Sequence, residues 1–315
     1  DFNDLMSRGV SLLTNYTEIE KTFNEKFDYI LVDEFQDVNT LQVKLLHKLL
    51  NENNQLFCVG DDLQSIYGWR GSEVDYIINF KKYFKNSKII KLNLNYRNNQ
   101  IITNATSCLI KRNIFKIEKE IFSVKNSEKK IYLYLSQKES EDGVKIVEER
   151  AKDLIKKGYL KEDILVLYRR TKSIDPYKIG LRGLATLRTM HSAKGLEAKI
   201  VFIVGLTGGI YGFPQIWEAD RIIQVIKPSS YLRSLEEERR LFYVAMTRAK
   251  EELFLISEIG NESQFIKELP EEFLEKNNFI ILNFQNQMKL TCNNCNLSIE
   301  PISNFCPNCG KKNLR

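Results

Sequence analysis

The chain has 315 residues, of which 43% are hydrophobic and 28% are charged, and its 47 basic and 41 acidic residues give a formal net charge of +6. This length exceeds what one hydrophobic core usually supports, so we expect two domains. No apolar run approaches the ~18 residues of a membrane-spanning helix, and no signal-peptide pattern is present. We therefore expect a soluble, cytoplasmic protein. The basic bias is mild and spread along the chain, which is compatible with nucleic-acid binding and does not establish it.

The first prominent feature is the apolar run 29–32, which follows a helical segment expected over 1–24. The run predicts a strand buried on both faces, as in a parallel sheet covered by helices. Asp33 and Glu34 come directly after it, where an open α/β sheet binds its ligands. One carboxylate could hold Mg²⁺ on a phosphate while the other orients and deprotonates a water. The alternative is an acidic turn after a core strand, and this stretch alone does not decide between the two.

A helix is expected over 41–50 and a second buried strand over 56–59, and the polar, glycine-punctuated loop 60–71 follows. Gln64 could reach a γ-phosphate or the attacking water. Tyr67 and Trp69 carry flat rings that could stack on bases, each stack worth about 1–3 kcal/mol. The alternative for both rings is that they anchor the loop to the core.

A third strand is expected over 88–94, with Arg97 shortly after it and a helix over 100–110. An arginine at this place suits an arginine finger that faces a nucleotide cleft, although it could equally form a surface ion pair. The segment 115–130 is charged and lacks apolar periodicity, so we place a domain boundary there.

The second half repeats the pattern of strand and helix, with strands expected over 131–135, 164–168, 199–205 and 252–257 and helices over 141–157 and from Ser234 onward. This succession predicts a second parallel sheet. Ser234 and Glu237 have the spacing of a capping box that starts the last helix. Arg248 falls near the end of that helix, where a cation could simply satisfy the helix dipole.

The segment 186–197 precedes one of these strands and is dense in polar residues. His191 and Lys194 lie next to small residues and suit contacts with a phosphate backbone, and Glu197 could accept a hydrogen bond from a ribose hydroxyl. For His191 the alternative is a histidine that caps the core.

Four of the six cysteines crowd into the last residues of the chain, as Cys292, Cys295, Cys306 and Cys309. Two C-x-x-C pairs separated by ten residues predict a tetrahedral four-thiolate Zn²⁺ site. A module of roughly 25 residues has too little core to fold without the metal, so the site would be structural. The polar segment before it is expected to be a linker with a short helix over 264–276.

Taken in order, the motifs VDEFQD, GDDLQSIYGWRG, LNYR, TMHSAKGLE and EEERRLFYVAMTRAKEEL resemble those of the UvrD/Rep group of superfamily 1 DNA helicases. The resemblance covers residues 1 to about 257 and implies two RecA-like domains with ATP between them. It implies nucleotide-site roles for the magnesium and water-activating pair Asp33 and Glu34, the γ-phosphate sensor Gln64, the arginine fingers Arg97 and Arg248, the adenine-stacking Tyr96 and the ribose-binding Glu197. It also implies contacts with single-stranded DNA for Tyr67, Trp69, Arg70 and His191.

Within this group the chain is similar to helicase IV. Only 171–188 separates the strand ending in YRR from TMHSAKGLE, which leaves no room for the accessory domain of larger members. The sequence YGFP at 211–214 also resembles helicase IV, whereas a C-terminal cysteine module is not expected in that enzyme.

The phosphate-loop pattern G-x-x-x-x-G-K-[ST] does not occur in the printed sequence, which begins at Asp1 without a methionine. The family places this loop before the DFDDL-like segment that residues 1–5 resemble, so we expect a truncated chain that does not hydrolyse ATP alone. Genuine loss of the loop is the alternative.

We therefore expect an α/β protein with two RecA-like parallel-sheet domains, the first one incomplete, and a small C-terminal zinc ribbon. The expected domains are 1–127 and 128–259, with a linker at 260–289 and the ribbon at 290–315. The expected function is an ATP-dependent DNA helicase that moves 3′ to 5′ in repair or recombination. It would use ATP, Mg²⁺ and Zn²⁺, and it would bind single-stranded and duplex DNA and a protein partner of the ribbon. The alternatives are a helicase subunit of a nuclease complex and a non-catalytic binding module with an inactive motor remnant.

Overall fold

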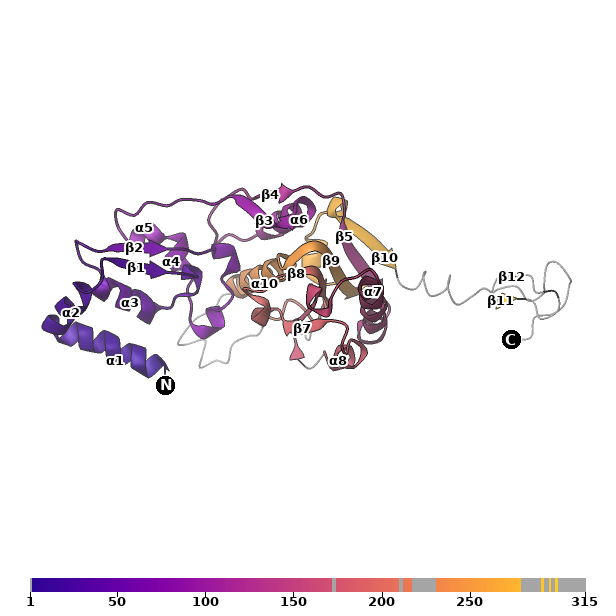
Figure 1. The fold of residues 1–315 in the computed structure, drawn as a ribbon, viewed down its shortest axis with the longest axis horizontal. Coiled ribbons are helices and arrows are strands. Elements are labelled where there is room, and N and C mark those ends of the chain that lie inside the picture. Colours follow the sequence, from indigo (N-terminus) through magenta and orange to yellow (C-terminus); the bar gives the residue numbers. More distant parts are fainter. Residues whose placement is uncertain are drawn as a thin grey trace.

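The computed structural model describes residues 2–171, 174–209, 212–216, 231–278, 290–291, 295 and 298–299. A small sheet, β1–β2, lies at one end of the described part and a larger sheet at the other, with α10 between them (Figure 1). Three of the expected zinc ligands, Cys292, Cys306 and Cys309, lie outside the described residues, as does the start of the YGFP phrase. None of the helices in the described part of the chain has the length and apolar character that a membrane crossing requires.

The first part of the chain forms a helical pair and a two-stranded parallel sheet. Its elements are α1 (Phe2–Asn15), α2 (Thr17–Asn24), β1 (Tyr29–Val32), α3 (Thr40–Leu49) and β2 (Gln55–Cys58). The expectation that β1 is buried on both faces is wrong, because Tyr29 and Leu31 are 67% and 73% exposed. Ile30 and Val32, on the other face, pack against the cluster that includes Phe35. Among the described residues, α3 and the segment 76–84 supply that cluster and cover one face of the strands only.

The middle of the chain connects the two sheets. It contains 3-10 turns at Phe35–Asp37, Asp62–Gln64 and Gly68–Arg70, then α4 (Asp75–Ile78), α5 (Phe80–Tyr83), β3 (Leu94–Asn99), α6 (Gln100–Ile110) and β4 (Phe122–Lys125). β3 pairs with β4 in parallel. The expected strand over 88–94 begins only at Leu94, so Arg97 lies within a strand rather than after it. The α6 helix starts where the Asn99 side chain accepts a hydrogen bond from the Ile102 N–H, as N-cap residues do.

The second sheet has six strands in the order β10-β5-β9-β8-β6-β7, and every neighbouring pair is parallel. The strands are β5 (Ile131–Ser136), β6 (Ile164–Tyr168), β7 (Thr186–Thr189), β8 (Ala198–Ile203), β9 (Ala249–Glu258) and β10 (Leu274–Asn278). The helices are α7 (Val144–Lys156), α8 (Asp175–Gly180), α10 (Tyr231–Met246) and the short α11 (Gln264–Lys267). The expected second parallel sheet is thus confirmed.

Two hydrophobic clusters cover the two faces of this sheet, because successive side chains of a strand point to opposite sides. Leu165 and Leu167 of β6 join α6 and α10 in one cluster. Ile164 and Val166 join α7 and α8 in the other. Figure 1 shows α7 and α8 on the side of the sheet away from α10.

Three sequence expectations differ from the structure in this half. The helix expected over 264–276 is only four residues long, because α11 ends at Lys267. The α10 helix begins at Tyr231, so Ser234 lies inside it and the predicted capping box is wrong. Part of the expected linker, 274–278, forms β10 and pairs with β5 at the edge of the sheet. Parallel pairing places this strand beside one that lies more than a hundred residues earlier, and no local pattern indicates such a partner. A further antiparallel pair joins β11 (Leu290–Thr291) to β12 (Ser298–Ile299).

Candidate functional site

The carboxylates that follow β1 are both exposed at the end of the strand. Asp33 Oδ1 accepts a hydrogen bond of 2.8 Å from the Glu34 N–H. Glu34 has left-handed backbone dihedrals, φ 50° and ψ 41°, which are uncommon for a residue other than glycine and are a recurrent feature of functional sites. Its carboxylate accepts a hydrogen bond from Gln36 Nε2. A cavity of about 400 Å³ borders both carboxylates, lined also by Met6 and Gln42.

Lys194, from the second half of the chain, reaches these acidic residues. Its Nζ lies 2.5 Å from Asp37 Oδ2 and 3.6 Å from Glu34 Oε2, and it donates a hydrogen bond of 2.9 Å to the Gln64 carbonyl. The Lys194 side chain is only 8% exposed, so in this structure it ion-pairs with carboxylates rather than presenting itself to a phosphate backbone. Burial raises the pKa of Asp37, and the hydrogen bond and charge of Lys194 counter that rise.

Gln64 and Arg248 meet although 184 residues separate them. Arg248 is 1% exposed, and its Nη2 lies 3.4 Å from Gln64 Oε1. Its Nε donates to the Val244 carbonyl in the last turn of α10, so the residue also fills the dipole-satisfying role of the alternative interpretation. Burial lowers the pKa of Arg248 to about 10, and the nearby charge of Arg97 adds to this effect.

The amide of Gln64 is oriented from its other side by Asp61. Gln64 Nε2 donates a hydrogen bond of 2.8 Å to Asp61 Oδ2. Lys119 Nζ lies 2.5 Å from Asp61 Oδ1 and 2.7 Å from Oδ1 of the buried Asp62. Because Asp61 accepts a hydrogen bond from the amide nitrogen of Gln64, the amide oxygen of Gln64 points toward Arg248.

Arg97 and Glu197 form an ion pair across the two halves of the chain. Arg97 Nε donates to Glu197 Oε2 at 2.8 Å, and Lys250 Nζ lies 2.5 Å from Glu197 Oε1. Hydrogen bonds from Lys250 and Arg97 lower the pKa of Glu197 to about 2. Tyr96 precedes Arg97 on β3 and is 67% exposed, so its ring is accessible.

The aromatic residues of the loop 60–71 gather around His191. Ring centroids of Tyr67 and Trp69 lie 6.5 and 6.2 Å from that of His191, and the Tyr67 hydroxyl lies 3.4 Å from the His191 carbonyl oxygen. The guanidinium of Arg70 lies 4.6 Å from the Trp69 ring and 5.2 Å from the Tyr67 ring. Trp69 is 63% exposed, whereas Tyr67 is partly buried against the core, as the anchoring alternative anticipated. Burial, aided by Arg169 and Arg70, lowers the pKa of His191 to about 4.

Several residues of this network were not among the sequence predictions. They are Gln36, Asp37, Lys119, Glu237, Glu238, Arg169 and Lys250. Arg169 makes a forked ion pair with Glu238, with Nη2 2.9 Å from Oε1. The run EEERR at 236–240 was a usable signal, because consecutive charged residues on a helix that faces a sheet need partners when they are buried. For Lys119, within a charged and aperiodic stretch, the sequence offers no comparable signal.

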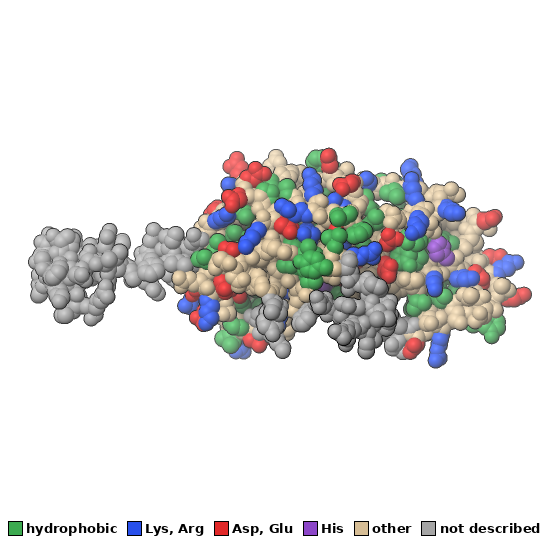
Figure 2. All heavy atoms as spheres, turned by 180° about the vertical axis from the view of Figure 1, so that it is seen from behind, with side chains coloured by type: hydrophobic (Ala, Val, Ile, Leu, Met, Phe, Trp, Pro, Cys, Tyr) green, Lys and Arg blue, Asp and Glu red, His purple; other side chains and the backbone are tan. Residues whose placement is uncertain are grey.

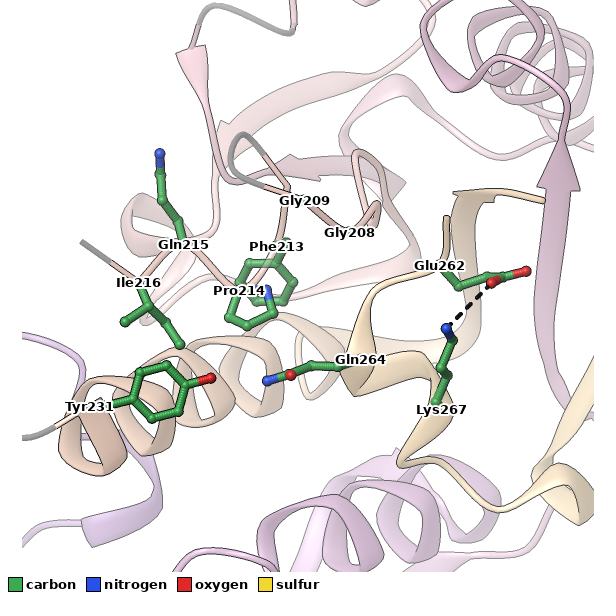
Figure 3. A pocket seen from close by; sticks show the side chains of 10 residues that line it. All are labelled: Gly208, Gly209, Phe213, Pro214, Gln215, Ile216, Tyr231, Glu262, Gln264 and Lys267. Atoms are coloured by element: carbon green, nitrogen blue, oxygen red, sulfur yellow. Dashed lines mark ion pairs between the residues drawn. The ribbon is translucent and has the colours of Figure 1, made fainter. Parts of the chain in front are cut away.

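A separate cavity of about 460 Å³ lies between Gly208 and Gly209, the segment 213–216, the first turn of α10, and α11 (Figure 3). Phe213, Pro214 and Gln264 line it, and the ion pair of Glu262 with Lys267, at 3.8 Å, borders it. None of the residues predicted to bind nucleotide or DNA lines this cavity.

The described side chains on the face seen from behind carry interspersed basic and acidic groups with hydrophobic groups between them (Figure 2). The described basic side chains are therefore not gathered into a single patch on that face.

Comparisons with known proteins agree with the order of these motifs. Residues 1–85 match the UvrD/REP helicase N-terminal domain, and residues 184–259 match the UvrD-like helicase C-terminal domain. A probable DNA helicase of Mycoplasma pneumoniae is 33% identical over 293 residues, which cover 87% of this chain and 53% of the relative. A probable DNA helicase II homolog of Mycoplasma capricolum subsp. capricolum is 40% identical over 169 residues, 54% of this chain and 23% of the relative.

The ATP-dependent DNA helicase Rep of Buchnera aphidicola subsp. Acyrthosiphon pisum is 39% identical over 169 residues, which cover 54% of this chain and 26% of the relative. The chain thus spans about half the length, or less, of these curated relatives. The two domain matches occur in chain order, and residues 184–259 include three strands of the six-stranded parallel sheet. The chain therefore carries UvrD/Rep-type helicase N- and C-terminal domains.

Proposed function

We propose that the protein of which this chain forms part is an ATP-dependent DNA helicase. One observation carries the proposal: the loop 60–71 contributes Gln64 to a polar network with Arg248 and Lys194, and a few residues later it presents the exposed ring of Trp69. A nucleotide that changes the distance between Gln64 and Arg248 therefore acts on the loop that carries Trp69. Such coupling is what a motor on a nucleic-acid strand requires.

In this proposal the nucleotide binds between the two halves of the chain. Asp33 and Glu34 offer the carboxylate oxygens that Mg²⁺ prefers, and Mg²⁺ supplies neutralisation of the phosphate charge when bound. Glu34 orients and deprotonates the attacking water. Gln64 senses the γ-phosphate, and Arg97 and Arg248 stabilise the charge that develops on it.

The adenosine part of the nucleotide would be held by Tyr96 and Glu197. The accessible ring of Tyr96 stacks on the adenine, and Glu197 accepts a hydrogen bond from the ribose. Because Arg97 and Lys250 occupy the Glu197 carboxylate in this structure, nucleotide binding exchanges at least one of these partners.

Single-stranded DNA would lie along the aromatic cluster. Trp69 and Tyr67 stack on bases, while Arg70 and His191 contact the strand. The ring of His191 is neutral near pH 7, since its pKa is about 4, and it therefore acts as a hydrogen-bonding group rather than as a cation. The resemblance to the UvrD/Rep group supports movement from 3′ to 5′.

Two further parts of the proposal concern the cysteine module, of whose four cysteines the structure describes only Cys295, and the subfamily of the motor. We infer that Cys292, Cys295, Cys306 and Cys309 hold a structural Zn²⁺ in a ribbon, and that the motor is closest to helicase IV. The phosphate-binding loop lacking in the printed sequence would be supplied by residues outside it. Metal analysis of the purified protein, with one zinc per chain expected and none in the variant with all four cysteines changed to serine, tests the ribbon.

The decisive experiment is ATPase activity with and without single-stranded DNA, measured on the protein from its complete reading frame. Strong stimulation by DNA is expected. Glu34→Gln should abolish hydrolysis and leave ATP binding intact, and retained DNA-stimulated hydrolysis in that variant would refute the role of Glu34. A wild-type protein that binds DNA and hydrolyses no ATP would instead indicate a non-catalytic binding module.

A further inference from the structure

Glu237, on helix α10, contacts the turn that carries Trp69. Its Oε1 accepts a hydrogen bond of 2.9 Å from the Gly68 N–H, across 169 residues of sequence. The Trp69 N–H also interacts with this carboxylate. These are the first amides of a short 3-10 turn, Gly68–Arg70, and amides at the start of such a turn have no partner within it. A carboxylate that accepts them makes charge-assisted hydrogen bonds, which are stronger than neutral ones.

The fit between Glu237 and the turn is close. A Cβ atom at Gly68 would collide with Glu237 Oε2. The Glu237 carboxylate therefore occupies the space that a side chain at position 68 would need, and a larger residue there would force the carboxylate or the turn to shift. Burial raises the pKa of Glu237. The backbone amides of Gly68 and Trp69 and the charge of Arg240 counter this rise in pKa, because they stabilise the ionised carboxylate.

The same helix is connected to the nucleotide side of the network. Arg248 follows two residues after α10 ends at Met246, and its Nε is tied to the Val244 carbonyl inside the helix. Its Nη2 reaches Gln64. With a rise of about 1.5 Å per residue, about 14 Å of helix separates Glu237 from Met246. One rigid element therefore touches the loop 60–71 at two points, through Arg248 at Gln64 and through Glu237 at Gly68.

We propose that Glu237 is a positioning residue that fixes the Gly68–Arg70 turn to helix α10, so that a displacement of α10 relative to Gln64 also moves the Trp69 ring. The inference deepens the proposed function and rests on the DNA-stacking role of Trp69. Glu237 touches neither nucleotide nor DNA in this account. It acts only through the place and the rigidity of the turn.

The test compares Glu237→Gln and Glu237→Ala with Glu236→Gln in the complete protein. The control is Glu236, a buried glutamate on the same helix that accepts backbone N–H groups of another loop, at Ile114 and Phe115. Glu236 also pairs with Arg240 at 3.5 Å, so this variant additionally reports any effect on DNA binding that passes through Arg240. Each Gln variant removes one negative charge from α10, so a general electrostatic effect on DNA binding appears in both. Affinity for a fluorescent oligo-dT strand, measured by anisotropy, is the first readout.

Trp69→Ala should weaken binding by about 5- to 150-fold, the range of one lost base stack. Glu237→Ala should weaken it by about tenfold and Glu237→Gln by less, since the amide oxygen of Gln still accepts one N–H. Glu236→Gln should stay within about twofold of the wild type. In the Trp69→Ala background, Glu237→Ala should cause no further loss, because the residue acts through that ring alone.

The second readout is the number of base pairs unwound per ATP hydrolysed. Glu237→Gln should lower this ratio and keep most of the DNA-stimulated ATPase rate, whereas a merely structural defect would lower both in parallel. Gly68→Ala places a Cβ atom against Glu237 Oε2, which forces the carboxylate and the turn apart without removing the carboxylate. This variant should reproduce the phenotype even if Glu237→Ala folds poorly.

The outcomes separate the inference from the function on which it rests. Unchanged affinity and coupling in the Glu237 variants, with a clear loss for Trp69→Ala, would overturn the positioning role alone. Equal losses for Glu237→Ala in both Trp69 backgrounds would overturn it as well, since the effect would not pass through the ring. Unchanged DNA binding by Trp69→Ala would overturn the DNA-stacking role first and the inference with it.

Discussion

Replacement of Lys194 by methionine tests whether the buried ion pair joins the two halves of the molecule. The Lys194 side chain is 8% exposed and that of Asp37 is 20% exposed, with 2.5 Å between Nζ and Oδ2. Removing one partner of a buried pair typically costs about 3–5 kcal/mol, because the remaining charge is left uncompensated. Since Asp37 keeps some contact with water, we expect Lys194→Met to lower the free energy of unfolding by about 2–4 kcal/mol.

The pH dependence of this loss follows from Asp37. Burial already raises the pKa of Asp37, and loss of Lys194 would raise it further. A carboxyl whose pKa is higher in the folded state destabilises the fold as pH rises through that pKa. The difference between wild type and Lys194→Met should therefore be largest near neutral pH and shrink as the pH falls toward the pKa of Asp37.

The assay is urea unfolding followed by circular dichroism at pH 7.5 and pH 5. Lys199→Met is the control, because Lys199 pairs with Asp163 at 3.1 Å with 46% of its side chain exposed. Such a surface pair contributes at most about 1 kcal/mol. A loss for Lys194→Met no larger than that of the control, or the same loss at both pH values, would refute the reasoning.

Three other predictions follow from the network. Glu197→Gln should break the pair with Arg97 and lower the free energy of unfolding by less than about 1 kcal/mol, since the pair is partly exposed. Calorimetry should show weaker nucleotide binding, because a contact with the ribose is lost. Unchanged affinity would remove Glu197 from the site. In an NMR titration, the imidazole resonances of His191 should change near pH 4 rather than near pH 6.5. The free energy of unfolding should therefore decrease as the pH falls from 6.5 toward 4, because the unfolded chain binds the proton first. A titration midpoint near 6.5 would contradict the burial of this ring. Lys119→Met should leave the buried Asp62 carboxylate without its cation and lower the free energy of unfolding by about 3 kcal/mol, measured by thermal or urea unfolding. An unchanged stability would mean that another cation compensates the charge of Asp62.

Local sequence patterns predicted much of the second sheet because its strands are short, continuous apolar runs. The strand at Ile164–Tyr168 has the predicted bounds, and the helix over Gln100–Ile110 does too. The patterns failed where an element depends on distant partners. The strand β10 was expected to be part of a linker, and its polar residues pair with β5 only because the sheet edge is there.

The candidate site shows the same division. The acidic pair after β1, the Gln-containing loop and the two arginines were identifiable from residue type and from their positions after strands. Their partners were not, because Lys194 pairs with Asp37 across 157 residues and Glu237 reaches Gly68 across 169. Ion pairs of this kind depend on three-dimensional distance and on burial, neither of which residue spacing contains.

The amino-acid sequence by itself determined the order of the chemical groups and the elements that carry them, because hydrophobic periodicity and turn residues act over a few positions. Tertiary structure alone decided which groups meet. It placed Arg248 against Gln64, and it left Tyr29 and Leu31 exposed on a strand whose composition predicted burial. The physical reason is that the free energy of a buried charge or an apolar face depends on what covers it, and the covering residues come from remote parts of the chain.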